Sequence, residues 1–434
     1  MRRMFFLSII LCAFLGCTSN NYDSKEQSAN RDTLRTENVK FPEGIHKSPN
    51  LTIYDSLNSP RYEIKMVKEQ TFSSPRIIQF RVGDQIAVGD SGMVFIQDGV
   101  NIYVYDREGQ YLTTMGGEGR GPGEHIGFAK KEMIVQANRL FTYDDIQSRI
   151  NIFSLETFKP VGAIIMDPKK FKSLDNKGRI FTGNTLLHVP LYYSFTDSLL
   201  LVRFNGPRPS EIRTQAHVEK YKTYKLSSYY YLLNRKGDII SERIFEAPYK
   251  LKVIGKVAGG SPLQFENRFI MDLGPDGYIY TTNTQNFLIK VYNPDGTYNR
   301  AIFYPFKKKS FDSEKFINTY TEHKKMQEIL RNTEFPNNWP ALTDMFVDDE
   351  QRIWVATYAG DSKNYRWYVL DEEGQHFAAF NWQAHDFYRR PDTRGSIRTV
   401  KNGYMYVFQE TTDKENSSSG NFVRYKIVFS SRAK

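Results

Sequence analysis

One layout of four short strands joined by tight turns returns six times along this sequence. The clearest copies are residues 85–116, 269–304 and 345–380, and the weaker copies are residues 132–166, 172–205 and 396–410 with 420–429. A repeat with a period of roughly 40–50 residues indicates a modular architecture, because one small sheet cannot bury both of its faces alone. Radial stacking covers each face with the next sheet. The sequence therefore predicts an all-β fold, a six-bladed β-propeller with four-stranded antiparallel blades and one helical insertion.

Two segments outside the repeat complete this prediction. Residues 61–70, RYEIKMVKEQ, precede the first copy, and we expect them to add a strand to the last blade and close the ring. An unclosed ring would leave unpaired strand edges. Residues 310–330 place Phe316, Ile317 and Tyr320 near one helical stripe, with Asp312 or Ser313 as the N-cap. This helix is expected between two blades, where it either covers one mouth of the channel or packs at the rim.

The first 16 residues have the pattern of an export signal. Two arginines precede an apolar run at residues 4–15, which is too short for a membrane span of about 20 residues. Gly16 and Cys17 then resemble the end of a bacterial lipobox, in which the cysteine becomes the lipidated first residue, although Phe14 and Leu15 differ from the usual residues. We predict residues 1–16 as a lipoprotein signal peptide and Cys17 as the lipidation site. An ordinary signal peptide or a buried thiol is the alternative.

Residues 17–47 are polar and lack periodic apolar positions, which predicts a flexible tether between the anchor and a propeller of residues 48–434. Cys12, the other cysteine, lies in the signal, so the mature chain is expected to have no disulfide. Lipid chains on Cys17 would attach the protein to a membrane. The predicted location is therefore the cell envelope, at the outer membrane, facing either the periplasm or the cell surface.

The charge of the chain favours solubility over a specific anionic partner. There are 59 basic and 49 acidic residues, which gives a net charge of +10. Spread over a large surface, this excess indicates a soluble protein, and we predict no nucleic-acid partner. The densest basic cluster is Lys307 to Lys309, beside the predicted helix.

Residues 116–125, GGEGRGPGEH, contain five glycines and one proline. Their spacing fits neither the dinucleotide fingerprint nor the Walker motif, because the third glycine position and the Lys-Ser/Thr pair are absent. Glycine permits positive φ and proline fixes φ, so this stretch is built to turn several times in a defined way. We interpret it as a structural corner.

These residues, together with RLFTYDDIQSRINIFS at 139–154 and GYIYTTNTQNFLIKVYNPDG at 277–296, carry a resemblance. Over most of the chain after about residue 60, the sequence resembles the six-bladed β-propeller lipoproteins of Bacteroidetes, relatives of the NHL-repeat propellers. In that family a similar glycine-rich stretch ending in Glu-Phe follows the last strand of an early blade, and His125 takes the place of Phe here. The resemblance implies the fold and a crossing between blades at residues 116–125, but no activity.

No catalytic motif is evident. The sequence lacks HExxH, Walker, G-x-S-x-G and paired-cysteine patterns, and its seven histidines are scattered. Some NHL-type propellers are lyases that hold zinc through channel histidines, but this sequence has no clear counterpart of those ligands. No cofactor is therefore predicted, and a divalent metal assembled across blades stays an open alternative. The aspartates 348–349 are expected at a turn, and the tyrosine-rich residues 221–234 suit packing between blades better than ligand binding.

Two functions remain. The first is an envelope lipoprotein whose propeller binds an envelope protein, a peptide or a glycan without catalysis, and the second is a channel-sited lyase or hydrolase acting on peptides or glycans. If the glycine-rich crossing binds the ligand, Arg120→Ala and Asp144→Ala should weaken binding without lowering thermal stability. The candidate ligand-binding residues are Glu118, Arg120, Glu124, His125, Tyr143, Asp144 and Arg149.

Overall fold

The chain divides into two units, Met1–Lys40 and Phe41–Lys434, and every residue that can be described lies in the second. The computed structural model describes residues 48–431 except 58, 74–79, 82–84, 127–132, 145, 167–191, 197–198, 206–217, 256–264, 266, 322–323, 360–362, 384–396 and 411–418. The predicted signal peptide, Cys17 and the tether therefore lie outside the described residues.

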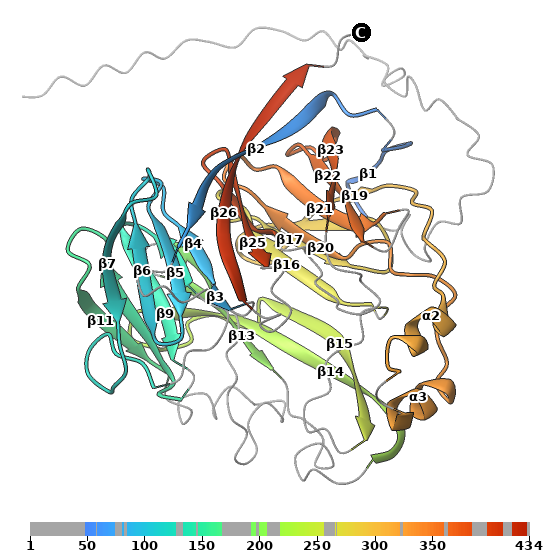
Figure 1. The fold of residues 1–434 in the computed structure, drawn as a ribbon, viewed down its shortest axis with the longest axis horizontal. Coiled ribbons are helices and arrows are strands. Elements are labelled where there is room, and N and C mark those ends of the chain that lie inside the picture. Colours follow the sequence, from blue (N-terminus) through green and yellow to red (C-terminus); the bar gives the residue numbers. More distant parts are fainter. Residues whose placement is uncertain are drawn as a thin grey trace, which may run out of the picture. The chain divides into compact units, whose positions relative to one another are not determined.

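Small antiparallel sheets make up most of the described chain, and two short helices stand apart from them (Figure 1). Blade 1 consists of β4 (Ile86–Val88), β5 (Val94–Asp98), β6 (Asn101–Tyr105) and β7 (Tyr111–Gly116). Blade 2 consists of β8 (Met133–Gln136), β9 (Arg139–Asp144), β10 (Arg149–Ser154) and β11 (Pro160–Ile165). Blade 3 consists of β12 (Tyr192–Thr196), β13 (Leu199–Asn205), β14 (Val218–Asn234) and β15 (Phe245–Gly255).

The second half of the chain repeats this layout. Blade 4 consists of β16 (Phe269–Leu273), β17 (Ile279–Asn283), β18 (Leu288–Tyr292) and β19 (Tyr298–Phe303), with β1 (Leu51–Ile53) parallel to β19. Blade 5 consists of β20 (Asp344–Val347), β21 (Ile353–Tyr358), β22 (Asn364–Leu370) and β23 (His376–Gln383). Blade 6 consists of β24 (Ile397–Lys401), β25 (Tyr404–Glu410), β26 (Ser419–Ser431) and β2 (Tyr62–Phe72), and β3 (Phe80–Arg81) also pairs with β26.

Burial confirms that both faces of these sheets are covered. Successive side chains of a strand point to opposite faces, so a strand that is buried at every residue is covered on both faces. Every residue of β21 is buried, as is every residue of β9 after the first. A hydrophobic cluster fills each gap between consecutive blades: Phe95 with Phe153 between blades 1 and 2, for example, and Phe422 with Tyr103 between blades 6 and 1. The last cluster joins the end of the ring to its beginning, so the predicted propeller arrangement is confirmed.

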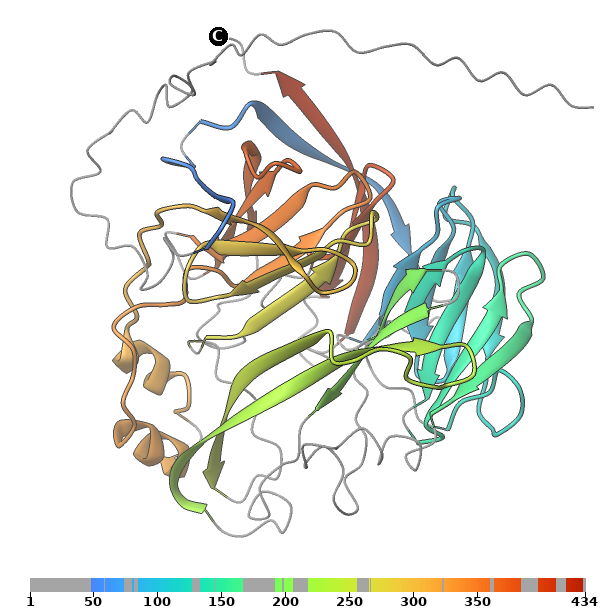
Figure 2. The ribbon, with the colours of Figure 1, turned by 180° about the vertical axis from the view of Figure 1, so that it is seen from behind.

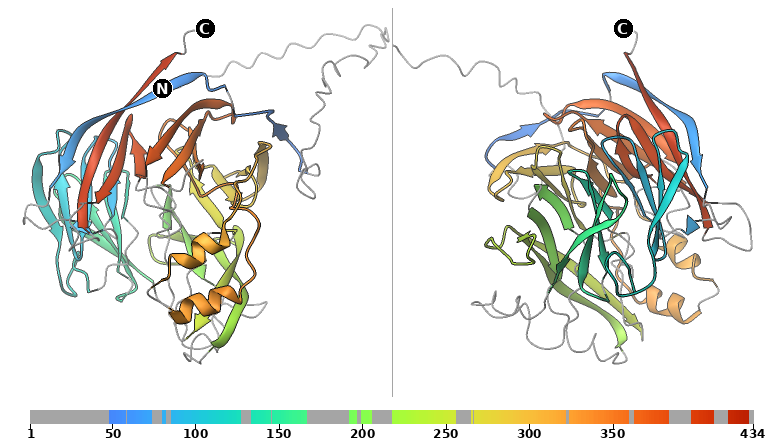
Figure 3. Two further views of the ribbon diagram at one scale, coloured as in Figure 1. Left: turned by 45° about the vertical axis from the view of Figure 1, so that its right-hand side comes forward. Right: turned by 90° about the vertical axis from the view of Figure 1, so that its left-hand side faces the viewer.

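The predicted closing strand is present. β2 runs antiparallel to β26, from Tyr62 opposite Ser431 to Phe72 opposite Phe422 (Figure 3). Upstream of it, the three-residue β1 was not predicted, and Tyr54 stacks on Tyr304 and donates a hydrogen bond to the Glu373 carbonyl at 2.9 Å. The N-terminal segment therefore contacts blades 4, 5 and 6 in turn.

Blade 3 differs from its prediction. The repeat placed this unit at residues 172–205, whereas the described sheet occupies residues 192–255 and residues 172–191 lie outside the description. The shift arises because β14 and β15 are long paired strands (Figure 2), so this blade exceeds the period of the other copies. Within β14, Tyr230 packs toward blade 4 and Tyr231 toward blade 2. For these two tyrosines, the predicted packing between blades is confirmed.

The predicted helix at residues 310–330 is two helices, α2 (Ser313–Asn318) and α3 (Lys324–Arg331). Asp312 is the N-cap, and its Oδ1 accepts a hydrogen bond from the Lys315 amide at 2.9 Å. α2 ends where the Thr319 hydroxyl donates to the Phe316 carbonyl at 2.7 Å, a local bond that competes with helix continuation. Phe316, Ile317 and Leu330 are buried with aromatic residues of blade 5, which gives the insertion a packing role at the rim.

Candidate functional site

The glycine-rich stretch is the crossing from blade 1 to blade 2, as the sequence predicted. After β7, the Gly117 amide donates to the Val100 carbonyl at 3.0 Å, and the His125 amide donates to the Gly117 carbonyl at 2.8 Å. Gly119 has φ of +151°. A Cβ at this position would collide with the Glu124 carboxylate, which accepts a hydrogen bond from the Gly121 amide at 2.7 Å. Gly119 is therefore needed for both the backbone conformation and the space.

Polar side chains of blade 2 hold this crossing in place. Asp144 is fully buried, and its Oδ2 accepts a hydrogen bond from the Ile126 amide at 2.7 Å. The Arg149 guanidinium donates to the carbonyls of Gly121 at 2.9 Å and Glu124 at 2.7 Å. A guanidinium offers several donors in a fixed planar arrangement, so it can bind two carbonyls of one loop. These contacts make the crossing a braced connection between blades.

His125 is fully buried at the centre of the crossing. Its Nε2 lies 2.9 Å from the Thr142 Oγ1, and its ring stacks on Phe153 with the ring centroids 6.4 Å apart. Burial, with a smaller contribution from the Arg149 charge, lowers the pKa of His125 to about 4, although the Asp144 charge opposes this. His125 therefore keeps an aromatic packing role at the position where the resembling family has Phe.

We expect the stability of the protein to fall as the pH drops from about 6.5 toward 4. The unfolded chain takes up a proton on His125 near its ordinary pKa of 6.5, whereas the folded chain does so only near a pKa of about 4. The contribution of neutral His125 is complete above pH 6.5, and about 3 kcal/mol of it is lost over this window. Urea unfolding at several pH values measures the loss. His125→Phe should flatten the dependence, and an unchanged slope in that variant would assign the effect to other groups.

The other predicted site residues differ in how exposed their side chains are. Glu118 and Arg120 are exposed, whereas Glu124 and Arg149 are half-buried and Tyr143 is buried between blades 2 and 3. The structure brings Glu124, His125, Asp144 and Arg149 together, and their described contacts hold the crossing itself. Ligand binding by this set, with Glu118 and Arg120 as its exposed members, stays a prediction.

A second feature lies at the opposite end of β8 from the crossing. A pocket of about 260 Å³ is lined by the ends of the first strands of blades 2, 4, 5 and 6. We call it the four-blade pocket. Its polar side chains are Gln136 from β8, Asp348 and Asp349 after β20, and Thr399 and Lys401 from β24.

Hydrogen bonds link the turns around this pocket from one blade to the next. The Val347 amide donates to the Asp272 Oδ2 at 2.8 Å, which joins blade 5 to blade 4. The Asn402 amide donates to the Asp349 Oδ2 at 2.8 Å, which joins blade 6 to blade 5. Lys401 forms an ion pair with Asp90 at 2.8 Å, which joins blade 6 to blade 1. The pocket therefore has a wall that is fixed before any ligand binds.

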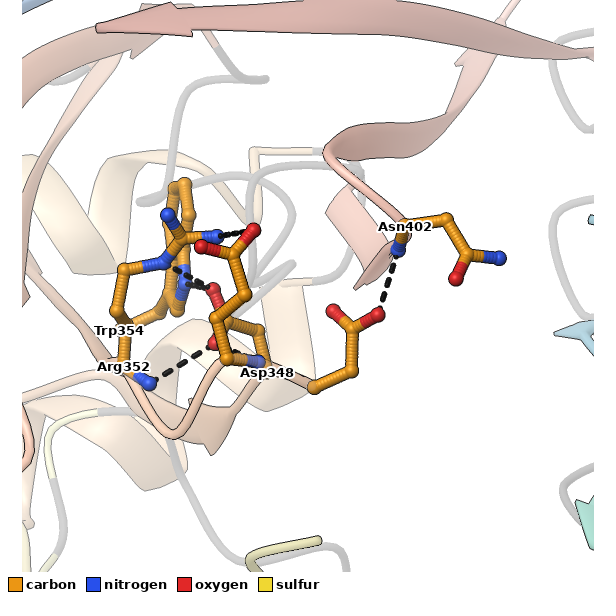
Figure 4. A network of polar contacts seen from close by, with 6 residues as sticks. Asp348, Arg352, Trp354 and Asn402 are labelled. Atoms are coloured by element: carbon orange, nitrogen blue, oxygen red, sulfur yellow. Dashed lines mark hydrogen bonds and ion pairs between the residues drawn. The ribbon is translucent and has the colours of Figure 1, made fainter. Parts of the chain in front are cut away.

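Asp348 holds the turn that positions Asp349 at the pocket. Its buried carboxylate accepts hydrogen bonds from the Arg352 Nε at 2.7 Å and the Trp354 Nε1 at 2.8 Å (Figure 4). Its other oxygen accepts from the Arg352 amide at 2.9 Å, which closes the turn and confirms the turn role predicted for this aspartate pair. With the turn fixed, Asp349 lines the pocket.

Two residues that line the pocket each carry an enclosed oxygen. Among the described residues, neither the Gln136 Oε1 nor the Asp349 Oδ1 has a hydrogen-bond partner. Buried acceptors are normally satisfied, and leaving one without a donor costs about 1–3 kcal/mol. Two acceptors of this kind therefore belong to residues that line one pocket.

Sequence reasoning missed Gln136 and Lys401. Both stand at the end of a first strand, as Leu273 and Val347 do in their own copies of the repeat. Aligning the six copies on the end of this strand would have placed these residues in one ring. Among the described residues, no group of three or more His, Cys, Asp or Glu is arranged to hold a metal. His125 and His376 belong to separate sites, because His376 packs on Tyr368 in blade 5.

The sheets, their clusters and their closing strand define this chain as a β-propeller, and comparison with known proteins agrees. The model of a family described as a 6-bladed beta-propeller, DUF5128, matches residues 79–246. An exported-protein candidate of Bacteroides fragilis is similar at 12% identity and a TM-score of 0.44, with 88% of this chain and 99% of that chain covered. A member of the DUF4221 family from Bacteroides vulgatus is similar at 11% identity and a TM-score of 0.46, with 86% and 99% covered. No curated protein sequence matches the chain.

Proposed function

We propose that this protein is an envelope-anchored lipoprotein whose β-propeller binds a ligand or partner protein at the four-blade pocket. The observation that carries the proposal is the pair of enclosed oxygens, Gln136 Oε1 and Asp349 Oδ1, which have no hydrogen-bond partner among the described residues. A ligand that brings N–H or O–H donors would satisfy both oxygens.

The size and charge of the pocket favour the tip of a peptide segment. Its volume of about 260 Å³ lies just below the range of roughly 300–1,000 Å³ typical of small-molecule sites. A backbone amide and a short polar side chain supply donors in a small space. Lys401 could bind a ligand carbonyl or carboxylate, since its partner Asp90 is 85% exposed and such surface ion pairs are weak.

The proposed attachment to a membrane is inferred from the N-terminal residues 1–17. Residues 1–17 supply the export and lipidation pattern, and residues 18–47 supply length between the membrane and the propeller. In the part of the chain that the structure describes, no helix has the length and apolar character needed to cross a membrane. Lipid chains on Cys17 would accordingly be the means of attachment.

The binding function is tested with the full chain and a displayed library of random heptapeptides. We expect peptides selected on this protein to lose about tenfold in affinity with Asp349→Ala or Gln136→Leu, because each variant removes an acceptor worth roughly 1–3 kcal/mol. Calorimetric titration measures the loss. Glu108→Gln, on an exposed residue of the turn between β6 and β7, is the control and should change affinity less than twofold.

Selected peptides that bind all three variants equally would place their site elsewhere and contradict the proposal. The anchoring half is tested separately by Cys17→Ser. This change should move the protein from the membrane fraction to the soluble fraction, and continued membrane attachment would contradict lipidation at Cys17.

A further inference from the structure

A larger cavity lies beside the two helices and has no role in the site described above. It has a volume of about 490 Å³, within the range of roughly 300–1,000 Å³ typical of ligand sites. We call it the insertion cavity. Its polar lining comes from the start of blade 4, the β17–β18 turn, the segment after β19 and the segment after α3: Asn267, Gln285, Lys308, Glu334, Asn337 and Asn338.

Backbone contacts hold the walls of the insertion cavity. The Phe311 amide donates to the Asn337 carbonyl at 2.9 Å, and the Trp339 amide donates to the Lys309 carbonyl at 2.8 Å. These two bonds fix the segment that carries Asn337 and Asn338 against the segment that carries Lys308. The same two segments also contact through side chains, because Phe335 stacks on Phe311 with the ring centroids 5.6 Å apart. A site whose walls are already ordered loses little entropy when it binds a ligand.

Lys308 is the cation among the residues that line the cavity. It is half-buried and forms no hydrogen bond or ion pair with the described residues, and burial lowers the pKa of its ammonium group. Its neighbours differ: Lys309 donates to the Ala359 carbonyl at 2.8 Å, and Lys307 is exposed. A partly desolvated cation without a counter-charge is unfavourable. An anionic group on a ligand would supply that charge.

The carboxamide side chains of the cavity indicate which hydrogen-bonding groups the rest of such a ligand carries. Four carboxamide side chains line the cavity. The Asn267 Nδ2 donates to the Gln285 Oε1 at 3.0 Å, and the remaining amide groups can still donate and accept hydrogen bonds. Sugar hydroxyls also do both, so they match such a lining better than groups that only accept. Half-buried Phe335 adds an apolar ring against which the C–H face of a sugar can pack.

Glu334 restricts the charge of the ligand. Its carboxylate lines the same cavity and forms no ion pair with a described residue. One cation and one carboxylate suit a ligand with a single acidic group among many hydroxyls, and they disfavour a polyphosphate or a nucleic acid. We propose that the insertion cavity binds an acidic saccharide, with its acidic group on Lys308 and its hydroxyls on the four amides.

The test compares two exchanges of neighbouring lysines in the full chain. The probes are sialyllactose, which carries one carboxylate, sulfated lactose with one sulfate group, and neutral lactose. We expect one acidic probe to bind better than lactose, and we expect Lys308→Gln to weaken it by about tenfold or more, as for loss of one charged hydrogen bond. Lys307→Gln removes the same charge from an exposed position and should weaken binding less than twofold. Calorimetric titration measures affinity, and thermal unfolding checks that both variants fold.

The two acidic probes separate carboxylate from sulfate recognition, and a preference for either one supports the proposal. Equal losses in the two lysine variants would show general attraction to a basic surface and overturn it. Equal affinity for the neutral and acidic probes would also overturn it, as would the absence of binding by both acidic probes at millimolar concentration.

Discussion

A chain that begins at residue 73 is expected to lose cooperative folding. This truncation removes β2, which forms the edge of blade 6 and pairs with β26 along its length. It also removes Phe72, which is fully buried between blades 6 and 1, and Ile64 and Met66, which pack between blades 5 and 6. One strand therefore contributes to the cores on both sides of the last blade.

The expected loss is comparable with the stability of a whole domain. Removing one fully buried Phe side chain costs about 3–5 kcal/mol, and typical domains are stable by only about 5–15 kcal/mol. The truncated chain also exposes the backbone groups of β26, a template for pairing with other chains. We expect no cooperative thermal transition by circular dichroism, together with aggregation in light scattering.

A chain that begins at residue 60 is the matched control. It loses β1 and the stacking of Tyr54 on Tyr304, an aromatic contact worth about 0.5–1.5 kcal/mol, but keeps β2. This chain should unfold cooperatively with a modest loss of stability. If the chain that begins at residue 73 is as stable as this control, blade 6 is closed by its C-terminal strands and the role assigned to β2 is wrong.

The sequence predicted the closing strand because its signal is local. Residues 61–70 alternate in character and stand before the first repeat, and a propeller needs an edge strand at that place. β1 was not predicted, because three residues carry no periodic pattern and their pairing with β19 depends on a distant part of the chain. Blade 3 was misplaced for a related reason: a repeat period cannot indicate how long an atypical copy becomes.

The same distinction applies to the candidate sites. The crossing at residues 116–125 could be predicted, because glycine and proline specify backbone conformation from their own positions. Gln136 and Asp349 lie more than 200 residues apart in sequence, and only closure of the ring brings both to one pocket. No local pattern identifies such a pair. The burial of Asp144 was missed because its partner, the Ile126 amide, follows the crossing and lies 18 residues earlier in the chain.

Asp144→Ala is expected to lower the free energy of unfolding by roughly 3 kcal/mol. The carboxylate accepts hydrogen bonds from the Ile126 amide at 2.7 Å, the Gln147 amide at 2.8 Å and the Gln147 Nε2 at 2.7 Å. Alanine would leave the two backbone amides without this acceptor, and each such loss costs about 1–3 kcal/mol. The Gln147 Nε2 would keep the Gly119 and Glu124 carbonyls as acceptors. This differs from the expectation drawn from sequence, in which Asp144→Ala left stability unchanged. The midpoint of urea unfolding at constant slope measures the effect.

Arg120→Ala and Asp144→Asn are the controls for this measurement. Arg120 is exposed, so its removal should change stability by less than about 0.5 kcal/mol. Asparagine keeps one acceptor oxygen but turns an NH₂ group toward a backbone or Gln147 donor, so Asp144→Asn should fall between the wild type and Asp144→Ala. A stability ranking in that order identifies Asp144 as the brace between blades 1 and 2. An Asp144→Ala protein that unfolds at the wild-type urea concentration would contradict that role, and ligand binding would then be the stronger explanation for a carboxylate at this position.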